Sequence, residues 1–195
     1  MESDIDPQSG FRLPLLKRDD LDDVGKQAFD EAVTPGRSIA GLQGPAGVQL
    51  YAGKALPHLR ALTKYLHAQA GFSGRIREIA ILAVAREMDS QVQWTMHEDV
   101  ALKEGLEPAV IDVIRHRKST DGLDEADAVV IELGRETYGE HKVTPQTFAR
   151  ARAVFGAHRL VDLLLLMGNC ASTAGLLIAV DMQLHADRKP TLPIP

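Results

Sequence analysis

Apolar residues recur at helical spacing along most of the chain, and no apolar run alternates with polar residues as a half-buried strand would. We predict an all-α fold of about eight helices, as a single domain spanning residues 1–195. Residues 1–17 are expected to form an extended N-terminal arm and residues 188–195 a proline-rich tail. The predicted helices cover about 19–33, 57–66, 75–87, 90–104, 108–118, 124–139, 145–155 and 158–184.

Short-range signals predict where several of these helices begin and end. Asp19 or Asp20 is a candidate N-cap, and Thr144 followed by a proline is another. Gly105 stands where a helix C-cap is expected. The glycines between residues 38 and 53 fit no phosphate-binding pattern, so we expect loops and close helix contacts there.

The most polar constellation lies in the stretch 75–106. Its first helix carries Glu78, and its second presents Ser90, Gln93 and His97 at spacings of three and four, which place them on one face. A short turn makes such helices antiparallel neighbours and brings Glu78 towards His97. A carboxylate and an imidazole on facing helices predict a proton-transfer site, because histidine titrates near neutral pH.

Other interpretations of these residues remain open on spacing alone. A lone histidine on a helix is usually structural, and Glu78 has Arg75, Arg77 and Arg86 as alternative partners. Ser90 is more simply an N-cap than a nucleophile, since no G-x-S-x-G elbow is present. Trp94 either walls a pocket beside the imidazole or fills the core. The H-E-x-x-H pattern and any Cys/His cluster are missing, so no metal site is expected.

Composition argues against several classes of protein, among them nucleic-acid-binding, disulfide-bonded and secreted proteins. The net charge of −5 and the low aromatic content of 5% argue against nucleic-acid binding. Cys170 is the only cysteine, so no intramolecular disulfide is possible, and a lone cysteine in an apolar helix is usually inert. The acidic N-terminus lacks the apolar run of a secretion signal, and we expect a cytoplasmic protein.

The apolar run 163–180 is about long enough to span a bilayer. Polar residues interrupt it, and Asp162 and Asp181 bracket it, so we expect a helix buried within a soluble assembly and no membrane partner. Its small residues recur at three and four, which indicates a tightly packed neighbour or a subunit interface. They are Gly168, Ala171, Ser172 and Gly175.

The stretch 75–106 resembles the carboxymuconolactone decarboxylase-like family, which includes the alkylhydroperoxidase D branch. The family hallmark is R-x-R-E-x-x-I-L-x-V-A, a polar turn, E-W-x-x-H and then A-x-x-x-G-L. Apart from the glutamate before the tryptophan, the matching positions are Arg75-Ile76-Arg77-Glu78, Ile81-Leu82, Val84-Ala85, Trp94, His97 and Gly105-Leu106. The apolar C-terminal helix and its proline-containing tail are also similar.

The resemblance separates two kinds of chemistry. Peroxidase members carry a C-x-x-C pair, whose positions fall here on Ser90 and Gln93, while Glu78 matches the family glutamate. Because thiolate is the nucleophile for peroxide reduction, the resemblance implies the branch without peroxidase activity. A peroxidase-like antioxidant protein relying on Cys170, and a non-catalytic small-molecule-binding oligomer, are the alternatives.

The decarboxylase-like branch implies a cofactor-independent lyase acting on a small, anionic, carboxylated lactone or related metabolite. His97 is then the proton carrier, and Glu78 orients it or shares the proton. The resemblance implies a homo-oligomer, a trimer or hexamer. Gln93 replaces a glutamate of many members, which removes one candidate acid. The expected substrate-binding residues are Ser90, Gln93, Trp94 and Arg86, with Arg75 and Arg77 as further candidates for binding a carboxylate.

Overall fold

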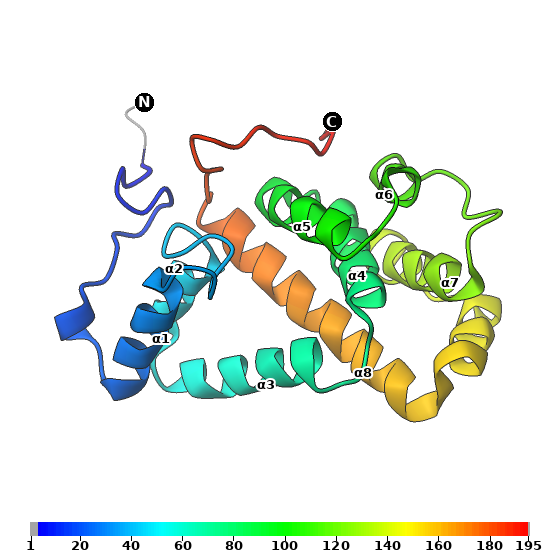
Figure 1. The fold of residues 1–195 in the computed structure, drawn as a ribbon, viewed down its shortest axis with the longest axis horizontal. Coiled ribbons are helices and arrows are strands. Elements are labelled where there is room, and N and C mark those ends of the chain that lie inside the picture. The colour runs from blue at the N-terminus through cyan, green and yellow to red at the C-terminus, as the bar shows by residue number, and fades with distance from the viewer. Residues whose placement is uncertain (1–3, 195) are drawn as a thin grey trace. The chain divides into compact units, whose positions relative to one another are not determined.

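The computed structural model describes residues 4–194 (Figure 1). No strand is present in that range, and the predicted all-α class is confirmed. Two short 3-10 helices, η1 Arg18–Asp20 and η2 Leu50–Ala55, and a π-helical turn, η3 Arg135–Gly139, complete the regular structure. The α-helices are α1 Asp23–Val33, α2 Pro45–Gln49, α3 Leu56–Ala68, α4 Gly74–Glu87, α5 Gln91–Lys103, α6 Pro108–Arg115, α7 Glu125–Gly134 and α8 Pro145–Ala179.

The helix caps agree with the sequence at some ends and differ at others. Gly105 closes α5 with a positive φ of 84°, as predicted, because glycine adopts that conformation without strain. The cap of α1 is Asp22, whose carboxylate accepts from the Gly25 amide at 2.8 Å, whereas Asp19 and Asp20 lie in η1. Ser90 occupies the N-cap position of α5, but its hydroxyl makes no capping bond.

Two stretches agree with the prediction only in part. The glycine-rich stretch 38–53 contains α2, where a Cβ on Gly47 would lie 2.0 Å from the Leu42 carbonyl oxygen, so glycine there permits helix packing. The break predicted between the helices 145–155 and 158–184 is confirmed as a kink at Gly156 within α8, but α8 ends at Ala179 and not near residue 184. Gly156 breaks its helical geometry with φ 72° and ψ 166°, a conformation open essentially to glycine alone.

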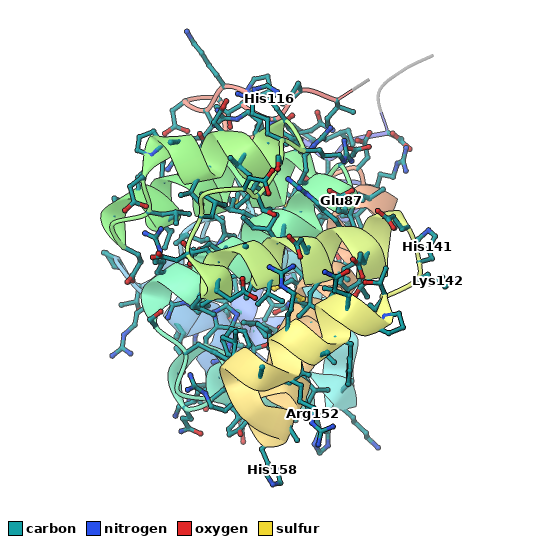
Figure 2. The ribbon with its side chains drawn as sticks, turned by 90° about the vertical axis from the view of Figure 1, so that its right-hand side faces the viewer. Glu87, His116, His141, Lys142, Arg152 and His158 are labelled. Carbon is teal, nitrogen blue, oxygen red and sulfur yellow. The ribbon has the colours of Figure 1, made fainter. Side chains whose placement is uncertain are left out.

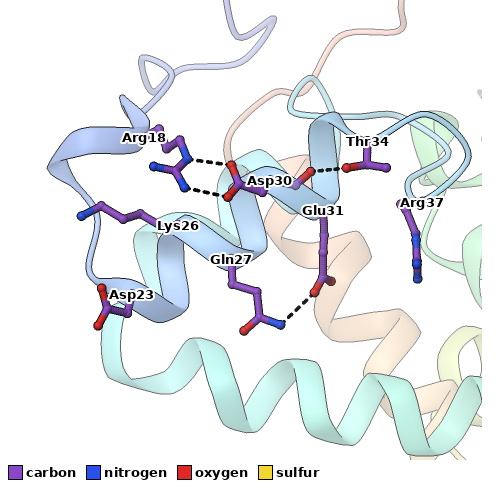
Figure 3. A pocket seen from close by; sticks show the side chains of 8 residues that line it. All are labelled: Arg18, Asp23, Lys26, Gln27, Asp30, Glu31, Thr34 and Arg37. Carbon is purple, nitrogen blue, oxygen red and sulfur yellow. Dashed lines mark hydrogen bonds and ion pairs between the residues drawn. The ribbon is translucent and has the colours of Figure 1, made fainter.

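The chain divides into two compact units, and the single domain over residues 1–195 stays a prediction. The first unit comprises residues up to 62 together with 175–189. Its small core joins Ala28, Leu50 and Leu56, and the N-terminal arm pairs with the segment after α8 through Arg12 N–H and the Val180 carbonyl at 2.9 Å. Along α1 it carries a polar pocket, shown in Figure 3, where Asp30 accepts two bonds from Arg18.

The second unit, residues 63–174 and 190–194, is organised around α4. Every residue from Glu78 to Arg86 is buried, which explains why this helix is apolar almost all round. It packs against α5, α6, α7 and η3, and its core includes Ile81, Trp94, Leu133 and Leu163. A carboxylate placed on such a helix is withdrawn from water.

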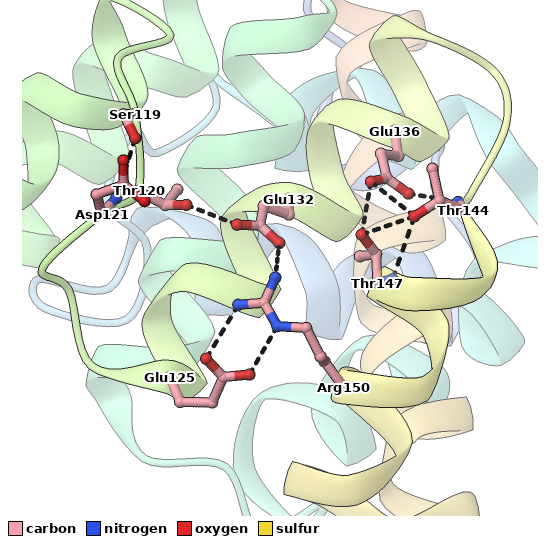
Figure 4. A network of polar contacts seen from close by, with 9 residues as sticks. All are labelled: Ser119, Thr120, Asp121, Glu125, Glu132, Glu136, Thr144, Thr147 and Arg150. Atoms are coloured by element: carbon pink, nitrogen blue, oxygen red, sulfur yellow. Dashed lines mark hydrogen bonds and ion pairs between the residues drawn. The ribbon is translucent and has the colours of Figure 1, made fainter.

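A polar network ties the start of α8 to α7 and η3 (Figure 4). Arg150 binds Glu125 through two nitrogens at 2.8 and 3.0 Å, and it also donates to Glu132. Glu136 of η3 accepts from the Thr144 amide and from the Thr147 hydroxyl, each at 2.6 Å. These bonds fix η3 in place beside the beginning of α8.

The apolar run of α8 is long and apolar enough to cross a membrane by length and composition. Only 33% of its most apolar window is buried within the chain. Val161 and Leu165 are 55% and 46% exposed, and Gly168 and Ser172 are exposed further along the same face. The second unit therefore presents an apolar helix face edged with small residues.

Candidate active site

The structure places the carboxylate of Glu78 against the imidazole of His97. Glu78 Oε2 lies 2.8 Å from His97 Nδ1, between α4 and α5. The Glu78 side chain is 2% exposed and that of His97 is 17% exposed. A buried anion thus holds a histidine that still reaches the surface, which is an arrangement suited to moving a proton between the protein and a bound molecule.

Arg77 completes the charge balance of this pair. Its Nε donates to Glu78 Oε1 at 3.1 Å, so each oxygen of the carboxylate has its own partner. Its two terminal nitrogens donate to the His67 carbonyl at 3.4 Å and to Glu104 at 3.2 Å. The guanidinium is therefore fixed at three points and cannot swing away from Glu78 without losing them.

The ionisation of Glu78 follows from these contacts. Burial favours the neutral carboxyl, but the hydrogen bonds and charges of His97 and Arg77 outweigh it and lower the pKa of Glu78. Glu78 is therefore a carboxylate at neutral pH. A carboxylate only accepts, so neutral His97 carries its proton on Nδ1 and leaves the Nε2 lone pair available as a base.

His67 of α3 is a site residue that the sequence analysis missed. Burial lowers its pKa, and the neighbouring charges of His97 and Arg77 lower it further. A second imidazole that stays neutral thus lies within electrostatic reach of His97. It belongs to no recognisable motif, so the sequence contained no signal for it.

Two buried polar side chains lie on α5 between His97 and the turn to α4. Gln93 donates from Nε2 to the Cys170 carbonyl at 3.4 Å. Gln93 Oε1 and the Ser90 hydroxyl have no hydrogen-bond partner among the residues described, although the two residues are only 5% and 2% exposed. Buried polar atoms of this kind cost about 1–3 kcal/mol each when unpaired, and a bound molecule would satisfy them.

Cys170 of α8 is close to the same site. It is 4% exposed, and burial together with the negative charge of Glu78 raises the pKa of its thiol to about 12. The thiol is therefore protonated at neutral pH and is a poor nucleophile. This agrees with the expectation of an inert packing residue.

The arginines and the tryptophan expected at the substrate site are held elsewhere. Trp94 is fully buried and donates from its indole to Glu98 at 3.0 Å, so it fills the core. Arg86 is buried and donates to Asp89 at 2.7 Å, and Arg75 binds Asp127 at 2.6 Å. Each of these arginines, like Arg77, already has a carboxylate partner within the chain.

The part of the chain that the structure describes contains no group of three or more histidine, cysteine, aspartate or glutamate side chains arranged to hold a metal ion. Comparison of the chain with family models, curated proteins and solved structures finds no match. The resemblance to the carboxymuconolactone decarboxylase-like family therefore stays a prediction based on the sequence motif.

Proposed function

We propose that this protein is a cofactor-independent lyase of the carboxymuconolactone decarboxylase type, acting on a small carboxylated lactone or related metabolite. The observation that carries the proposal is the 2.8 Å contact between Glu78 and His97. It places a partly exposed imidazole against a buried, ionised partner that orients it. Such a set performs acid–base chemistry without any added group.

In the proposed reaction, the bond between the substrate carbon and its carboxylate breaks, and carbon dioxide leaves. The bonding electrons remain on the substrate as an enolate of the adjacent carbonyl. Protonated His97 then delivers a proton to that carbon, and a proton from solvent restores the imidazolium. Glu78 stabilises the positive charge on the ring and keeps its orientation, as a carboxylate does for a catalytic histidine.

Ser90 and Gln93 are the residues we propose for substrate binding. The Ser90 hydroxyl can donate to an enolate or carbonyl oxygen, and Gln93 Oε1 can accept from a substrate hydroxyl. Their unpaired atoms in the unliganded chain support this role. Trp94 and Arg86 then act by supporting the helices behind them.

The family fold and its assembly belong to the same proposal. α4 and α5 pack against each other across the short connection 88–90, in keeping with an antiparallel central pair. The exposed apolar face of α8 supports a homo-oligomer, a trimer or hexamer, because apolar surface of this kind is usually covered by a partner subunit. We propose a cytoplasmic location for this assembly.

A substrate panel tests the function. Carboxylated lactones and β-keto acids are incubated with wild-type protein and with His97→Gln, and products are followed by mass spectrometry. We expect conversion by the wild type and a loss of about 10²–10⁴-fold in the variant, the usual contribution of a general acid or base. Full activity of His97→Gln would rule out the mechanism. No conversion of any substrate by the wild type would favour a binding protein.

A peroxide arm tests the alternative antioxidant function. Peroxide and a thiol donor are added to the wild type and to Cys170→Ser, since Cys170 is the only thiol in the chain. Because the pKa of the Cys170 thiol is raised to about 12, little thiolate forms at neutral pH. We therefore expect no thiol-dependent peroxide consumption and very slow alkylation of the native protein. Peroxide turnover that disappears in Cys170→Ser would establish the peroxidase instead.

A further inference from the structure

The second unit has a polar cavity beside the end of α4, the turn after α6, and η3. Its volume is about 650 Å³, within the range of small-molecule sites. Glu87, Arg117, Arg135, Tyr138 and His141 are among the side chains that line it. Figure 2 shows Glu87 and His141 on the same side of the molecule.

Glu87 and Arg117, two of the charged residues that line the cavity, form an ion pair with each other. Arg117 donates from Nε to both oxygens of Glu87, at 3.1 and 3.0 Å. The Glu87 side chain is only 6% exposed and its charge is paired with Arg117, so the pair does not contribute a free charge to the cavity. Glu140, which also lines the cavity, is exposed to water at its edge.

Arg135 differs from Arg75, Arg77 and Arg86 because it has no ion pair within residues 4–194. It is half-buried, and its guanidinium donates to the Val113 carbonyl at 2.9 Å. Burial and the charge of Arg117 lower the pKa of Arg135, and they outweigh the opposite effect of the Glu87 and Glu132 carboxylates. A guanidinium has five N–H donors in a planar fork, so most of them remain available to a ligand.

The local backbone supports a binding role. Arg135 and Tyr138 both belong to η3, and π-helical turns are rare and occur frequently at functional sites. Gly139 is required for the close approach, since a Cβ there would lie 2.7 Å from Glu87 Oε2.

We propose that this cavity binds a small oxyanion, a carboxylate or a phosphate, with Arg135 as its principal ligand. The planar fork of Arg135 donates two parallel hydrogen bonds to the anion, a geometry that suits both groups. His141 lines the same cavity and is a further candidate donor. This site is separate from the Glu78–His97 pair and does not depend on the proposed lyase reaction.

Binding is measured on the full chain by NMR, following the arginine Nε–Hε signals while succinate or inorganic phosphate is added. We expect saturable shifts of the Arg135 signal at millimolar concentrations. Arg135→Gln is expected to weaken binding at least about tenfold, the loss of one charge-assisted hydrogen bond or more. The tighter of the two probes identifies the class of anion.

Matched variants separate binding from folding. Arg152→Gln removes the same charge from an exposed position of α8 away from the cavity (Figure 2), and we expect unchanged affinity. Glu140→Gln removes an anion from the edge of the cavity and should tighten binding a few-fold. Absence of saturable shifts with both probes, or equal affinity of Arg135→Gln and wild type, would overturn the proposal.

Discussion

The second unit contains two polar sites that differ in how many partners their buried or half-buried charged group has within the chain. At the first, buried Glu78 is bonded by His97 on one oxygen and by Arg77 on the other. At the second, half-buried Arg135 is bonded only by a backbone carbonyl within residues 4–194. The first site is complete before any substrate arrives, whereas the second has unused donors.

The difference follows from burial. A carboxylate that is 2% exposed must have its partners in the folded chain, because an unpaired buried charge costs several kcal/mol. A cation at the edge of a cavity retains some water and tolerates an incomplete set of partners. Complete sites hold reacting groups in a fixed geometry, and incomplete sites gain free energy from a ligand.

The largest expected effect comes from removing the charge of Glu78. Glu78→Gln keeps the shape of the side chain, but it removes the anion that stabilises the His97 imidazolium, and turnover should fall about 10²-fold or more. Glu104→Gln is the control, because Glu104 binds the same Arg77 and is largely outside the pair. Steady-state kinetics on the best substrate of the panel measures both, and an equal loss in the two variants would contradict the assignment.

Replacing Arg77 and Arg135 by methionine, one at a time, tests whether the paired arginine contributes more to stability than the arginine without an ion pair. Arg77→Met leaves Glu78 with one partner, and we expect the free energy of unfolding to fall by about 2 kcal/mol, below the usual cost of breaking a buried pair because His97 still binds the carboxylate. Arg135→Met removes a cation that has no ion pair within residues 4–194 and should change stability by less than about 1 kcal/mol. Urea denaturation measures both, and a larger loss for Arg135→Met would reverse our interpretation.

Acid should weaken the first site by protonating Glu78. The pKa of Glu78 is lower in the folded chain than in the unfolded one, so the unfolded state binds more protons near pH 4. The stabilisation is complete above the unfolded value of about 4.3 and is lost as the pH falls through the folded pKa. The difference in unfolding free energy between wild type and Glu78→Gln should therefore shrink below that pH, as measured by urea denaturation across a pH series. A difference that stays constant with pH would contradict the lowered pKa of Glu78.

Ser90→Ala is expected to have the smallest effect on stability. The Ser90 hydroxyl is buried without a partner, so its removal costs no hydrogen bond and relieves a desolvation penalty. We expect a change of less than about 1 kcal/mol, towards higher stability. Thermal unfolding measures it, and a clear destabilisation would mean that the hydroxyl is bonded in solution. The same variant should bind substrate less tightly if Ser90 contacts it.

The sequence predicted the parts of the site that lie close together in the chain. Helical periodicity placed Ser90, Gln93 and His97 on one face, and the short turn brought Glu78 to them, because both follow from local geometry. His67 and Cys170 join the site from α3 and α8, which are distant in sequence. No local pattern encodes such tertiary neighbours.

Elsewhere the sequence failed for identifiable reasons. The glycines in 38–53 were expected in loops and close helix contacts; the tight contact at Gly47 fits that expectation, but the short helix α2 around it was not predicted. The helix predicted over 124–139 continues through its last residues as a π-helical turn, whose periodicity over five residues is too short to recognise. That Arg75, Arg77 or Arg86 binds a substrate carboxylate stays a prediction; the folded chain gives each of them an acidic partner that the sequence did not indicate.

Proton exchange at carbon tests the central claim most directly. A carboxylated lactone or β-keto acid is incubated with the protein in D₂O, and replacement of its carbon-bound hydrogen next to the carbonyl is followed by NMR. We predict exchange with the wild type that falls about 10²–10⁴-fold in His97→Gln, because His97 carries the proton. Exchange at the same rate with both proteins would show that the Glu78–His97 pair is structural.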